Sequence, residues 1–297
     1  MKRKFIEEEC VALLRDYLLA NGLTVEWLFD RPAYDLPPAM LSECEIDGFR
    51  YDDDPDAYCI TNLVYSLLYW DVLGLGEAIG EQYRGETMNS FGWTFTKDLK
   101  EHLYTGRDAK VEDFQDIGEY TRLSAICFDD NGQIDENICI QLGEYFKISH
   151  TLGNFMPLPQ HVEGETLNLK RSSAFKDYFD LFLLEIKKYY KDPKAYISKE
   201  NKTTIEEQIN RDATKSPSLE TESNYFTKFK GFRDFIDKNF LTMYVDGDYE
   251  VIMYSSNDDT EDPHIAKGED ALTFAKEAIK RIKARAKIQA EVLNRIL

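Results

Sequence analysis

Residues 174–190 read AFKDYFDLFLLEIKKYY, and this stretch sets the expected fold class. Its aromatic and aliphatic side chains recur every three or four residues, the spacing that gathers them on one face of an α-helix. The positions are Phe175, Tyr178, Phe179, Phe182, Ile186, Tyr189 and Tyr190. Pro193 follows the run and would interrupt a longer helix. The stretch therefore predicts an amphipathic helix that buries an aromatic face.

The segments around this stretch repeat the helical pattern. The same spacing of apolar residues occurs in 3–20, 111–128, 134–147 and 225–241. Only residues 242–255 (TMYVDGDYEVIMYS) are rich in strand-forming residues. Asp246-Gly247 suits a hairpin turn, although the preceding helix running through Tyr244 with one short strand after it is the alternative. We expect a mainly α fold, an irregular helical domain, with a minor β-hairpin or short strand near 242–255.

A single domain over residues 1–297 is the expected organisation, because this length supports one large core. In 198–224 the apolar residues are limited to Ile205, Ile209, Ala213 and Leu219, which predicts a mobile insertion. Residues 268–297 contain no proline, and their apolar residues alternate spacings of three and four, which predicts a long C-terminal helix. Its apolar stripe would pack on its own domain or pair with the same helix of a second subunit to form a homodimer.

The charge of the chain is strongly negative and unevenly distributed. It has 36 basic and 55 acidic residues, a net charge of −19. Residues 267–297 hold eight basic and four acidic residues, a net of +4, so the rest of the chain carries −23. This balance makes nucleic acid an unexpected partner and disfavours an anionic membrane surface. The longest strongly apolar uncharged stretch, 58–70, is shorter than the roughly 20 residues that span a bilayer.

A cytoplasmic location is the expectation from the cysteines and the N-terminal residues. The five cysteines are odd in number and irregularly spaced, which is typical of reduced thiols. Glu7, Glu8 and Glu9 interrupt any apolar core of a signal peptide.

Patterns that would bind a metal or a nucleotide are incomplete. The acidic run 52–56 would place Ala57 and Leu63 where a calcium loop needs glycine and glutamate, and the loop 127–138 lacks both end ligands. Residues 74–80 read GxGxxxG, one residue away from the dinucleotide fingerprint, with no strand feeding them. The four histidines do not share a helix face at ligand spacing. We expect neither metal nor cofactor.

The most unusual polar residues follow the helix predicted over 134–147. The segment 150–159 reads HTLGNFMPLP, a rigid glycine- and proline-containing turn. His150 is the candidate catalytic residue, as a general acid–base, because the pKa of histidine lies nearest neutrality. Asn154, Asn168, Arg171 and Asp177 are the candidate ligand-binding residues, since arginine clamps anions and asparagine bonds irregular backbone. The alternative is a buried polar network that holds this loop on the core.

These motifs carry a resemblance. HTLGNFMPLP at 150–159, TLNLKR at 166–171 and DYFDLFLLEI at 177–186 are similar to the signature of an uncharacterised bacterial family of unknown function. The acidic run 52–56 followed by an aromatic helix also resembles its N-terminal part. The chain departs from the family where Ser172 and Tyr178 replace the usual glycine and arginine. The resemblance implies organisation and no mechanism.

A weaker similarity concerns the turn at 152–155. Its Leu-Gly-Asn-Phe resembles a turn in the tail of some HNH-type restriction nucleases. Those enzymes carry an upstream histidine with a nearby proline, whereas His102 is the one histidine before residue 150 and no proline lies near it. The catalytic motif of these nucleases is therefore missing.

Three functions follow from the sequence. The first is a non-catalytic binding or interaction module with an unknown partner. The second is a hydrolase-type enzyme with a polar pocket around His150, Asn154, Asn168 and Arg171. The third is a defence-related protein with a degenerate nuclease-like turn. Burial and complete hydrogen bonding of the pocket residues would count against the enzyme.

Overall fold

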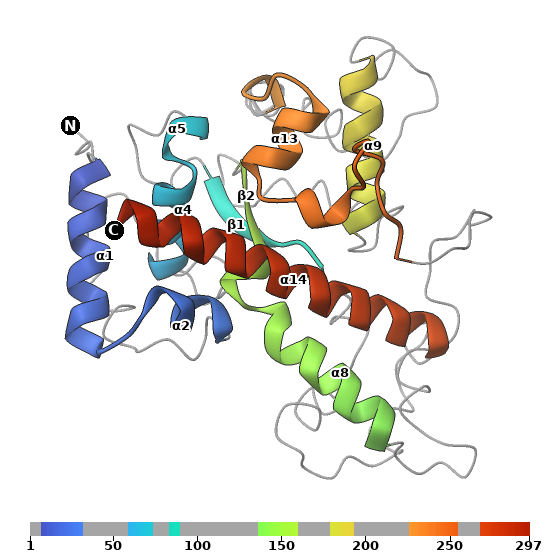
Figure 1. Cartoon of the computed structure of the whole chain (residues 1–297), viewed down its shortest axis with the longest axis horizontal. Coiled ribbons are helices and arrows are strands. Elements are labelled where there is room, and N and C mark those ends of the chain that lie inside the picture. The colour runs from blue at the N-terminus through green and yellow to red at the C-terminus, as the bar shows by residue number, and fades with distance from the viewer. Residues whose placement is uncertain are drawn as a thin grey trace, which may run out of the picture.

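The computed structural model describes residues 7–31, 59–73, 83–89, 136–159, 179–192, 226–254 and 268–297. Within these ranges most residues are helical, and one small sheet lies among the helices (Figure 1). The mainly α fold class is therefore confirmed. The helix predicted over 111–128, the insertion predicted over 198–224 and the acidic run 52–56 lie outside the described residues.

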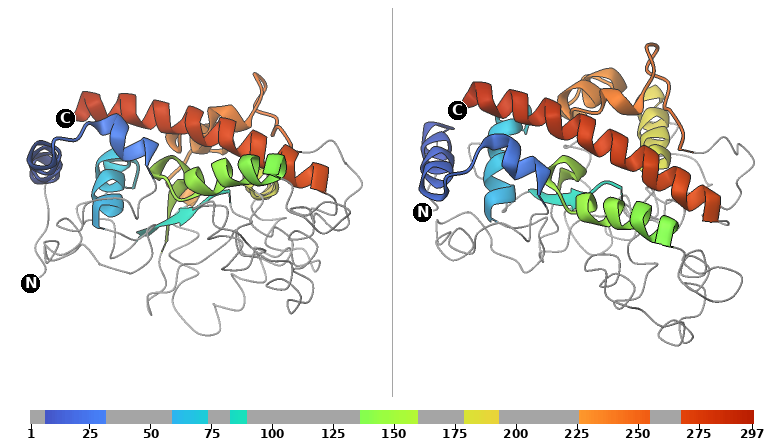
Figure 2. Two further views of the ribbon diagram at one scale, coloured as in Figure 1. Left: turned by 90° about the horizontal axis from the view of Figure 1, so that it is seen from below. Right: turned by 60° about the horizontal axis from the view of Figure 1, so that its bottom comes forward.

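The C-terminal helix α14 (Gly268–Ile296) organises the fold. Its 29 residues make it about 43 Å long, and it runs past most of the other helices and the sheet (Figures 1 and 2). One face of α14 is buried, and its apolar members are Phe274, Ala275, Ala278, Ile282, Ala286, Ala290 and Leu293. Four of these are alanines, which allow neighbouring backbone to approach closely. Most of the apolar stripe predicted for this helix thus packs on its own chain.

Several elements pack along α14. Those in contact with it are α2 (Val25–Asp30), α4 (Cys59–Leu68), α8 (Glu136–Ser149), the 3₁₀ turn η6 (Leu152–Asn154) and the 3₁₀ turn η8 (Thr242–Tyr244). Figure 2 shows that α8 lies alongside α14 for much of the length of α8. Helix α1 (Glu7–Asn21) packs on α4, and the short α5 (Trp70–Leu73) follows α4. The uncharged stretch predicted at 58–70 is therefore largely α4, whose residues from Ile60 onward are buried.

The turn between α1 and α2 shows how local sequence sets these helices. Gly22 adopts a φ of 62°, a conformation that glycine accepts without strain. The Leu23 N–H then donates to the Leu18 carbonyl at 2.9 Å and closes α1. Thr24 begins α2 by accepting the Trp27 N–H on its Oγ1 at 3.3 Å. Helix α2, which begins at this turn, lies against α14.

The sheet consists of β1 (Tyr83–Thr87) and β2 (Phe155–Pro159), paired antiparallel from Tyr83 opposite Pro159 to Thr87 opposite Phe155. The sequence did not predict it. Strand β2 reads FMPLP, and its prolines have no N–H to donate to a partner strand. Its buried residues also fail to alternate with exposed ones, because Phe155, Met156 and Leu158 are all buried. Figure 1 shows the sheet crossing beneath α14 near the middle of the molecule.

The β element expected near 242–255 is a narrow hairpin with one bridge, between Val245 and Val251. Asp246 closes it, since its Oδ1 accepts the N–H groups of Asp248 and Glu250, each at 2.9 Å. The preceding helix does not continue into this segment. It ends before Phe240, whose φ is 58°.

The two aromatic helices pack on each other. Helix α9 (Phe179–Lys191) contacts α13 (Phe232–Lys238), and the rings of Tyr190 and Phe235 have centroids 6.2 Å apart. The pattern over 225–241 yields a shorter helix than expected, because Gly231 has a φ of 156° immediately before α13. No helix in these seven described ranges is long and apolar enough to cross a membrane.

Candidate functional site

The structure describes two of the five residues that the sequence put forward for a site. His150 and Asn154 lie in the connection between α8 and β2. Asn168, Arg171 and Asp177 lie outside the described residues, so the predicted five-residue site stays a prediction. The two that are placed have very different surroundings.

Asn154 is fully buried and uses its whole hydrogen-bonding capacity inside the chain. Its Oδ1 accepts the backbone N–H and the side-chain Nδ2 of Asn89, both at 3.0 Å. Its Nδ2 donates to the carbonyl of Asn89 at 2.9 Å and to that of Ser149 at 2.7 Å. A carboxamide offers two donors and two acceptor lone pairs, and all four are engaged. Asn154 thus joins the end of α8 to the end of β1.

Three tyrosines extend this pairing into what we call the asparagine network: Asn89, Asn154, Tyr145, Tyr244 and Tyr254. Tyr145 donates to the Asn89 carbonyl at 2.8 Å, and Asn89 Nδ2 donates to the Tyr244 hydroxyl at 2.7 Å. The Tyr254 hydroxyl donates to Asn89 Oδ1. Burial raises the pKa of Tyr244, and it raises that of Tyr254 well above the ordinary value. Burial therefore favours the protonated form of both hydroxyls, and the hydrogen bond that Tyr254 donates requires it.

Arg285, on α14, holds the 152–155 turn through hydrogen bonds to its carbonyl groups. It is fully buried, and its guanidinium donates to the carbonyls of Gly153 at 2.9 Å, Phe155 at 2.5 Å and Asn239 at 3.1 Å. Its Nη2 also donates to the Tyr69 hydroxyl at 2.9 Å. No carboxylate among the described residues forms an ion pair with Arg285, so backbone dipoles stabilise the buried charge.

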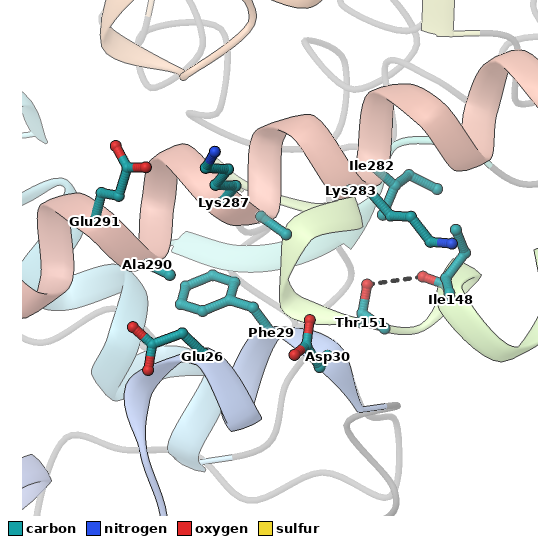
Figure 3. A pocket seen from close by; sticks show the side chains of 11 residues that line it. Glu26, Phe29, Asp30, Ile148, Thr151, Ile282, Lys283, Lys287, Ala290 and Glu291 are labelled. Carbon is teal, nitrogen blue, oxygen red and sulfur yellow. Dashed lines mark hydrogen bonds between the residues drawn. The ribbon is translucent and has the colours of Figure 1, made fainter.

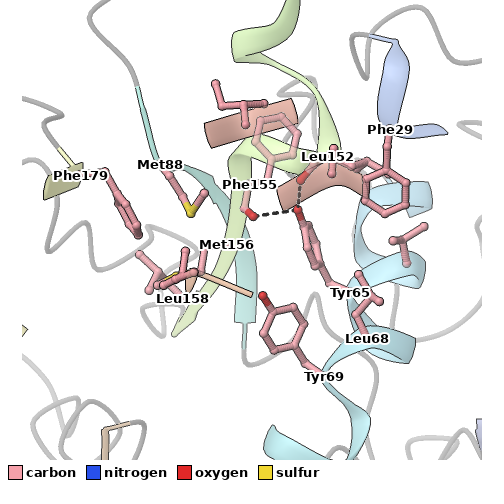
Figure 4. Packing of buried hydrophobic residues seen from close by; sticks show 14 of the residues in the cluster. Phe29, Tyr65, Leu68, Tyr69, Met88, Leu152, Phe155, Met156, Leu158 and Phe179 are labelled. Carbon is pink, nitrogen blue, oxygen red and sulfur yellow. Dashed lines mark hydrogen bonds between the residues drawn. The ribbon is translucent and has the colours of Figure 1, made fainter. Parts of the chain in front are cut away.

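The turn is also fixed by packing and by Tyr65. A Cβ atom on Gly153 would lie 2.7 Å from Ala286 Cβ and 2.9 Å from the Ile282 carbonyl oxygen, so only glycine fits against α14. The Tyr65 hydroxyl reaches the carbonyls of Leu152 and Phe155, the latter at 2.9 Å (Figure 4). Figure 4 shows the Tyr65 hydroxyl directed from α4 toward the turn within the apolar cluster. The 152–155 turn is therefore a structural hub.

A second buried arginine lies one turn earlier on α14. Arg281 is 3% exposed, and its guanidinium lies over the rings of Tyr254 at 4.3 Å and Tyr244 at 5.4 Å. Its Nη2 is 3.6 Å from Glu277 Oε2. The cation thus contacts the tyrosines of the asparagine network through their faces.

Sequence reasoning missed Asn89, Arg281 and Arg285. The one available signal was that Arg281, Arg285 and the buried Gln289 recur every four residues beside the apolar stripe.

His150 lies at the edge of this hub. It is half-buried, its Nδ1 is 3.1 Å from Ser149 Oγ, and its ring meets that of Phe155 edge-on with centroids 6.4 Å apart. The role of a general acid–base for His150 stays a prediction. Across the described ranges, no group of three or more histidine, cysteine or acidic side chains is arranged to hold a metal ion.

A groove of about 340 Å³ lies on the outer side of the hub, between α2, the end of α8 and α14, and we call it the α2–α14 groove. Its floor is apolar and consists of Phe29, Ile148, Ile282, Ala286 and Ala290. Its rim is polar and consists of Glu26, Asp30, Thr151, Lys283, Lys287 and Glu291. Figure 3 shows the α2 side chains on one side of the groove and the charged α14 side chains on the other.

Some of the rim charges are engaged and others are not. Lys283 Nζ is 2.6 Å from Glu144 Oε1, and Glu26 Oε1 accepts from Asn294 Nδ2 at 2.6 Å. The pKa of Glu26 is lowered mainly by a backbone hydrogen bond to its carboxylate and, to a smaller extent, by the hydrogen bond from Asn294. Asp30, Lys287 and Glu291 form no side-chain ion pair or hydrogen bond with the parts of the chain that the structure describes. The groove thus offers free charges of both signs above an apolar floor.

Comparison with known proteins shows which family the chain belongs to. A family model described as "Family of unknown function (DUF6994)" matches residues 52–288. The chain belongs to this family. The matched range contains the whole asparagine network, the 152–155 turn, Arg281 and Arg285. The expected membership of an uncharacterised family is confirmed. No curated protein and no solved structure matches the chain.

Proposed function

We propose that the chain is a non-catalytic binding module that takes a short peptide segment of a partner protein in the α2–α14 groove. The observation that supports this most directly is the combination of an apolar floor with unengaged charges of both signs on the rim. A peptide with one apolar side chain between an acidic and a basic residue matches it. Its acidic residue would meet Lys287, and its basic residue would meet Asp30 or Glu291.

The size and rigidity of the groove support the same proposal. Its volume of about 340 Å³ is at the lower end of the range for ligand pockets, which suits one or two anchoring side chains. Ile282 and Ala286, on its floor, belong to the α14 turns that pack against Gly153, while Arg285 holds the same turn. A floor fixed in this way is formed before the ligand arrives, which lowers the entropic cost of binding.

Selection from a random peptide library on the full-length chain tests the proposal. We expect enriched peptides to carry an apolar residue flanked by opposite charges. Lys287→Glu should raise the Kd of these peptides about fivefold or more, because it reverses an exposed charge at the binding site. Lys276→Glu is the matched control, since it makes the same charge change about three turns away on the exposed side of α14. The absence of enrichment, or an equal Kd for both variants, would refute the groove as the site.

A hydrolase built around His150 is the alternative function, with Asn154, Asn168, Arg171 and Asp177 as its ligand contacts. The half-buried position of His150 supports it, whereas the four internal hydrogen bonds of Asn154 count against a ligand contact there. If a hydrolytic activity is found, His150→Gln should lower its rate strongly, and the remaining rate should lose the pH dependence that histidine titration gives. An unchanged rate in this variant would exclude His150 as the acid–base.

Compartment and assembly are further proposals. We infer a cytoplasmic bacterial protein, supported by the buried free thiol of Cys10 and by the family resemblance. Its partner is a protein and not nucleic acid or membrane, which is consistent with the acidic chain. A homodimer through α14 has less support than a monomer, because much of the apolar stripe is buried within the chain. Light scattering on the full chain distinguishes the two masses.

A further inference from the structure

A second hollow lies across α14 from α8, where α9 and α13 are side by side (Figure 1). It has a volume of about 480 Å³ and is open to solvent. Four basic residues line it: Lys187 and Lys191 from α9, Lys230 just before α13, and Arg233 within α13. In a chain with a net charge of −19, such a local concentration of positive charge is unusual. We call this feature the cationic hollow.

Three of these four cations are not neutralised by the residues that the structure describes. Lys187 is the exception, since its Nζ lies 2.6 Å from Glu250 Oε1 and donates to the Tyr249 carbonyl at 3.0 Å. Lys191 and Lys230 form no ion pair within the described ranges. Arg233 places its guanidinium 4.7 Å from the centroid of the Tyr249 ring. Stacking uses the face of the guanidinium and leaves the N–H groups at its edge available.

The acidic residue of the hollow is directed to other partners. Asp234 Oδ2 accepts the backbone N–H of Lys230 at 2.9 Å and lies 3.5 Å from Lys238 Nζ. The carboxylate therefore fixes the backbone at the entrance of α13 and offsets Lys238. Among the residues that the structure describes, none offsets the charges of Lys191, Lys230 and Arg233, and these charges face a ligand.

The hollow also offers an apolar surface. Tyr190 and Phe232 line it, and the Tyr190 hydroxyl donates to the Phe226 carbonyl at 2.7 Å. With that hydroxyl engaged, Tyr190 contributes chiefly its ring. The Nζ of Lys187 lies over the ring of Phe232, 5.7 Å from its centroid. A ligand with an apolar body and a multiply charged anionic group matches this lining.

We propose that the cationic hollow binds a small organic phosphate. Its apolar part would lie on Tyr190 and Phe232, and its phosphate dianion would meet Lys191, Lys230 and Arg233. Three uncompensated cations favour a dianion over a monoanion, because the attraction scales with the charge. Arginine with its planar fork of donors suits phosphate oxygens, and lysine supplies point charges. This site is separate from the α2–α14 groove and does not depend on the peptide-binding proposal.

Calorimetry on the full chain at low ionic strength tests the proposal with three probes: phenyl phosphate, inorganic phosphate and phenol. Phenyl phosphate should bind at least about fivefold more tightly than either of the others, because it alone uses both parts of the hollow. Raising the salt concentration should weaken its binding. Equal affinity for inorganic phosphate would overturn the apolar half of the site, and equal affinity for phenol would overturn the anionic half.

The double variant Lys230→Gln/Arg233→Gln locates the binding. Both side chains are exposed, so the fold should be unaffected, and we expect the Kd for phenyl phosphate to rise about tenfold. Lys276→Gln/Lys280→Gln on α14 makes the same change in net charge and should leave the Kd within about twofold. If both double variants weaken binding equally, the effect is one of net charge and the assignment of the site is wrong.

Discussion

Asn154→Ala tests whether the 152–155 turn is a structural hub or part of a ligand site. The change removes the four hydrogen bonds that the side chain makes to Asn89 and Ser149. Two of the groups left behind keep other partners, because Asn89 Nδ2 still donates to Tyr244 and the Asn89 carbonyl still accepts from Tyr145. The Asn89 N–H and the Ser149 carbonyl lose these hydrogen bonds in a fully buried position.

The magnitude follows from those two groups. Each buried polar group left unsatisfied costs about 1–3 kcal/mol, and a water entering the vacated space recovers part of this. We therefore expect Asn154→Ala to lower the free energy of unfolding by about 3 kcal/mol. A typical domain has only about 5–15 kcal/mol, so the variant should still fold.

Urea unfolding followed by far-ultraviolet circular dichroism measures the effect. The loss corresponds to a fall of about 1–2 M in the midpoint, with an unchanged slope. Asn294→Ala is the control, because Asn294 is exposed and makes a hydrogen bond to Glu26, and its effect should stay below about 0.5 kcal/mol. A loss of less than 1 kcal/mol for Asn154→Ala would refute the hub and make Asn154 a candidate for ligand contact.

Further predictions concern packing and titration. Gly153→Ala should cost about 2–3 kcal/mol in urea unfolding because its Cβ meets backbone of α14, whereas Gly247→Ala, with no heavy atom near the new Cβ, should change stability little. Burial raises the pKa of Tyr244 and Tyr254, so folding stability should be complete below about pH 10 and fall above it as the unfolded chain ionises first. The part of the tyrosinate absorbance that comes from buried tyrosines should then rise only with unfolding, and ionisation of all 18 tyrosines in the native state would contradict the burial. Burial raises the pKa of the Cys10 thiol to about 11, so alkylation at pH 9 should require denaturant. Rapid alkylation of Cys10 itself in the native chain, identified by peptide mass spectrometry among the five cysteines, would contradict it.

The helices were predictable because a single property, the periodic burial of apolar residues, determines them. Helix α9 and its buried aromatic face follow from the spacing of phenylalanine and tyrosine, whereas its contact with α13 appears only in the structure. The long helix α14 likewise follows from the absence of proline and the alternating spacing of its apolar residues. Where this periodicity was interrupted, the prediction was less accurate, as at Gly231, which shortens the helix expected over 225–241.

The sheet and the hub were less predictable for physical reasons. Strand β2 is buried on both faces and contains two prolines, so neither alternation nor strand propensity identifies it. Arg285 reads as part of a basic, solvated helix, yet it is buried because carbonyl groups from two distant segments surround it. The partner of Asn154 is Asn89, 65 residues earlier in the chain, and no local pattern encodes such a contact. The sequence identified the 152–155 turn as unusual, while its partners became apparent only in the folded chain.

Hydrogen–deuterium exchange of the full-length chain, with and without a library-selected peptide, tests most directly the claim that the α2–α14 groove is the binding site. Exchange reports the local opening of backbone amides, and a bound ligand slows it where it contacts and rigidifies the chain. We predict slower exchange in α2 and in the part of α14 from Ile282 to Glu291, with α9 and α13 unchanged. Protection confined to α9 and α13, or no protection in α2 and α14, would contradict the account.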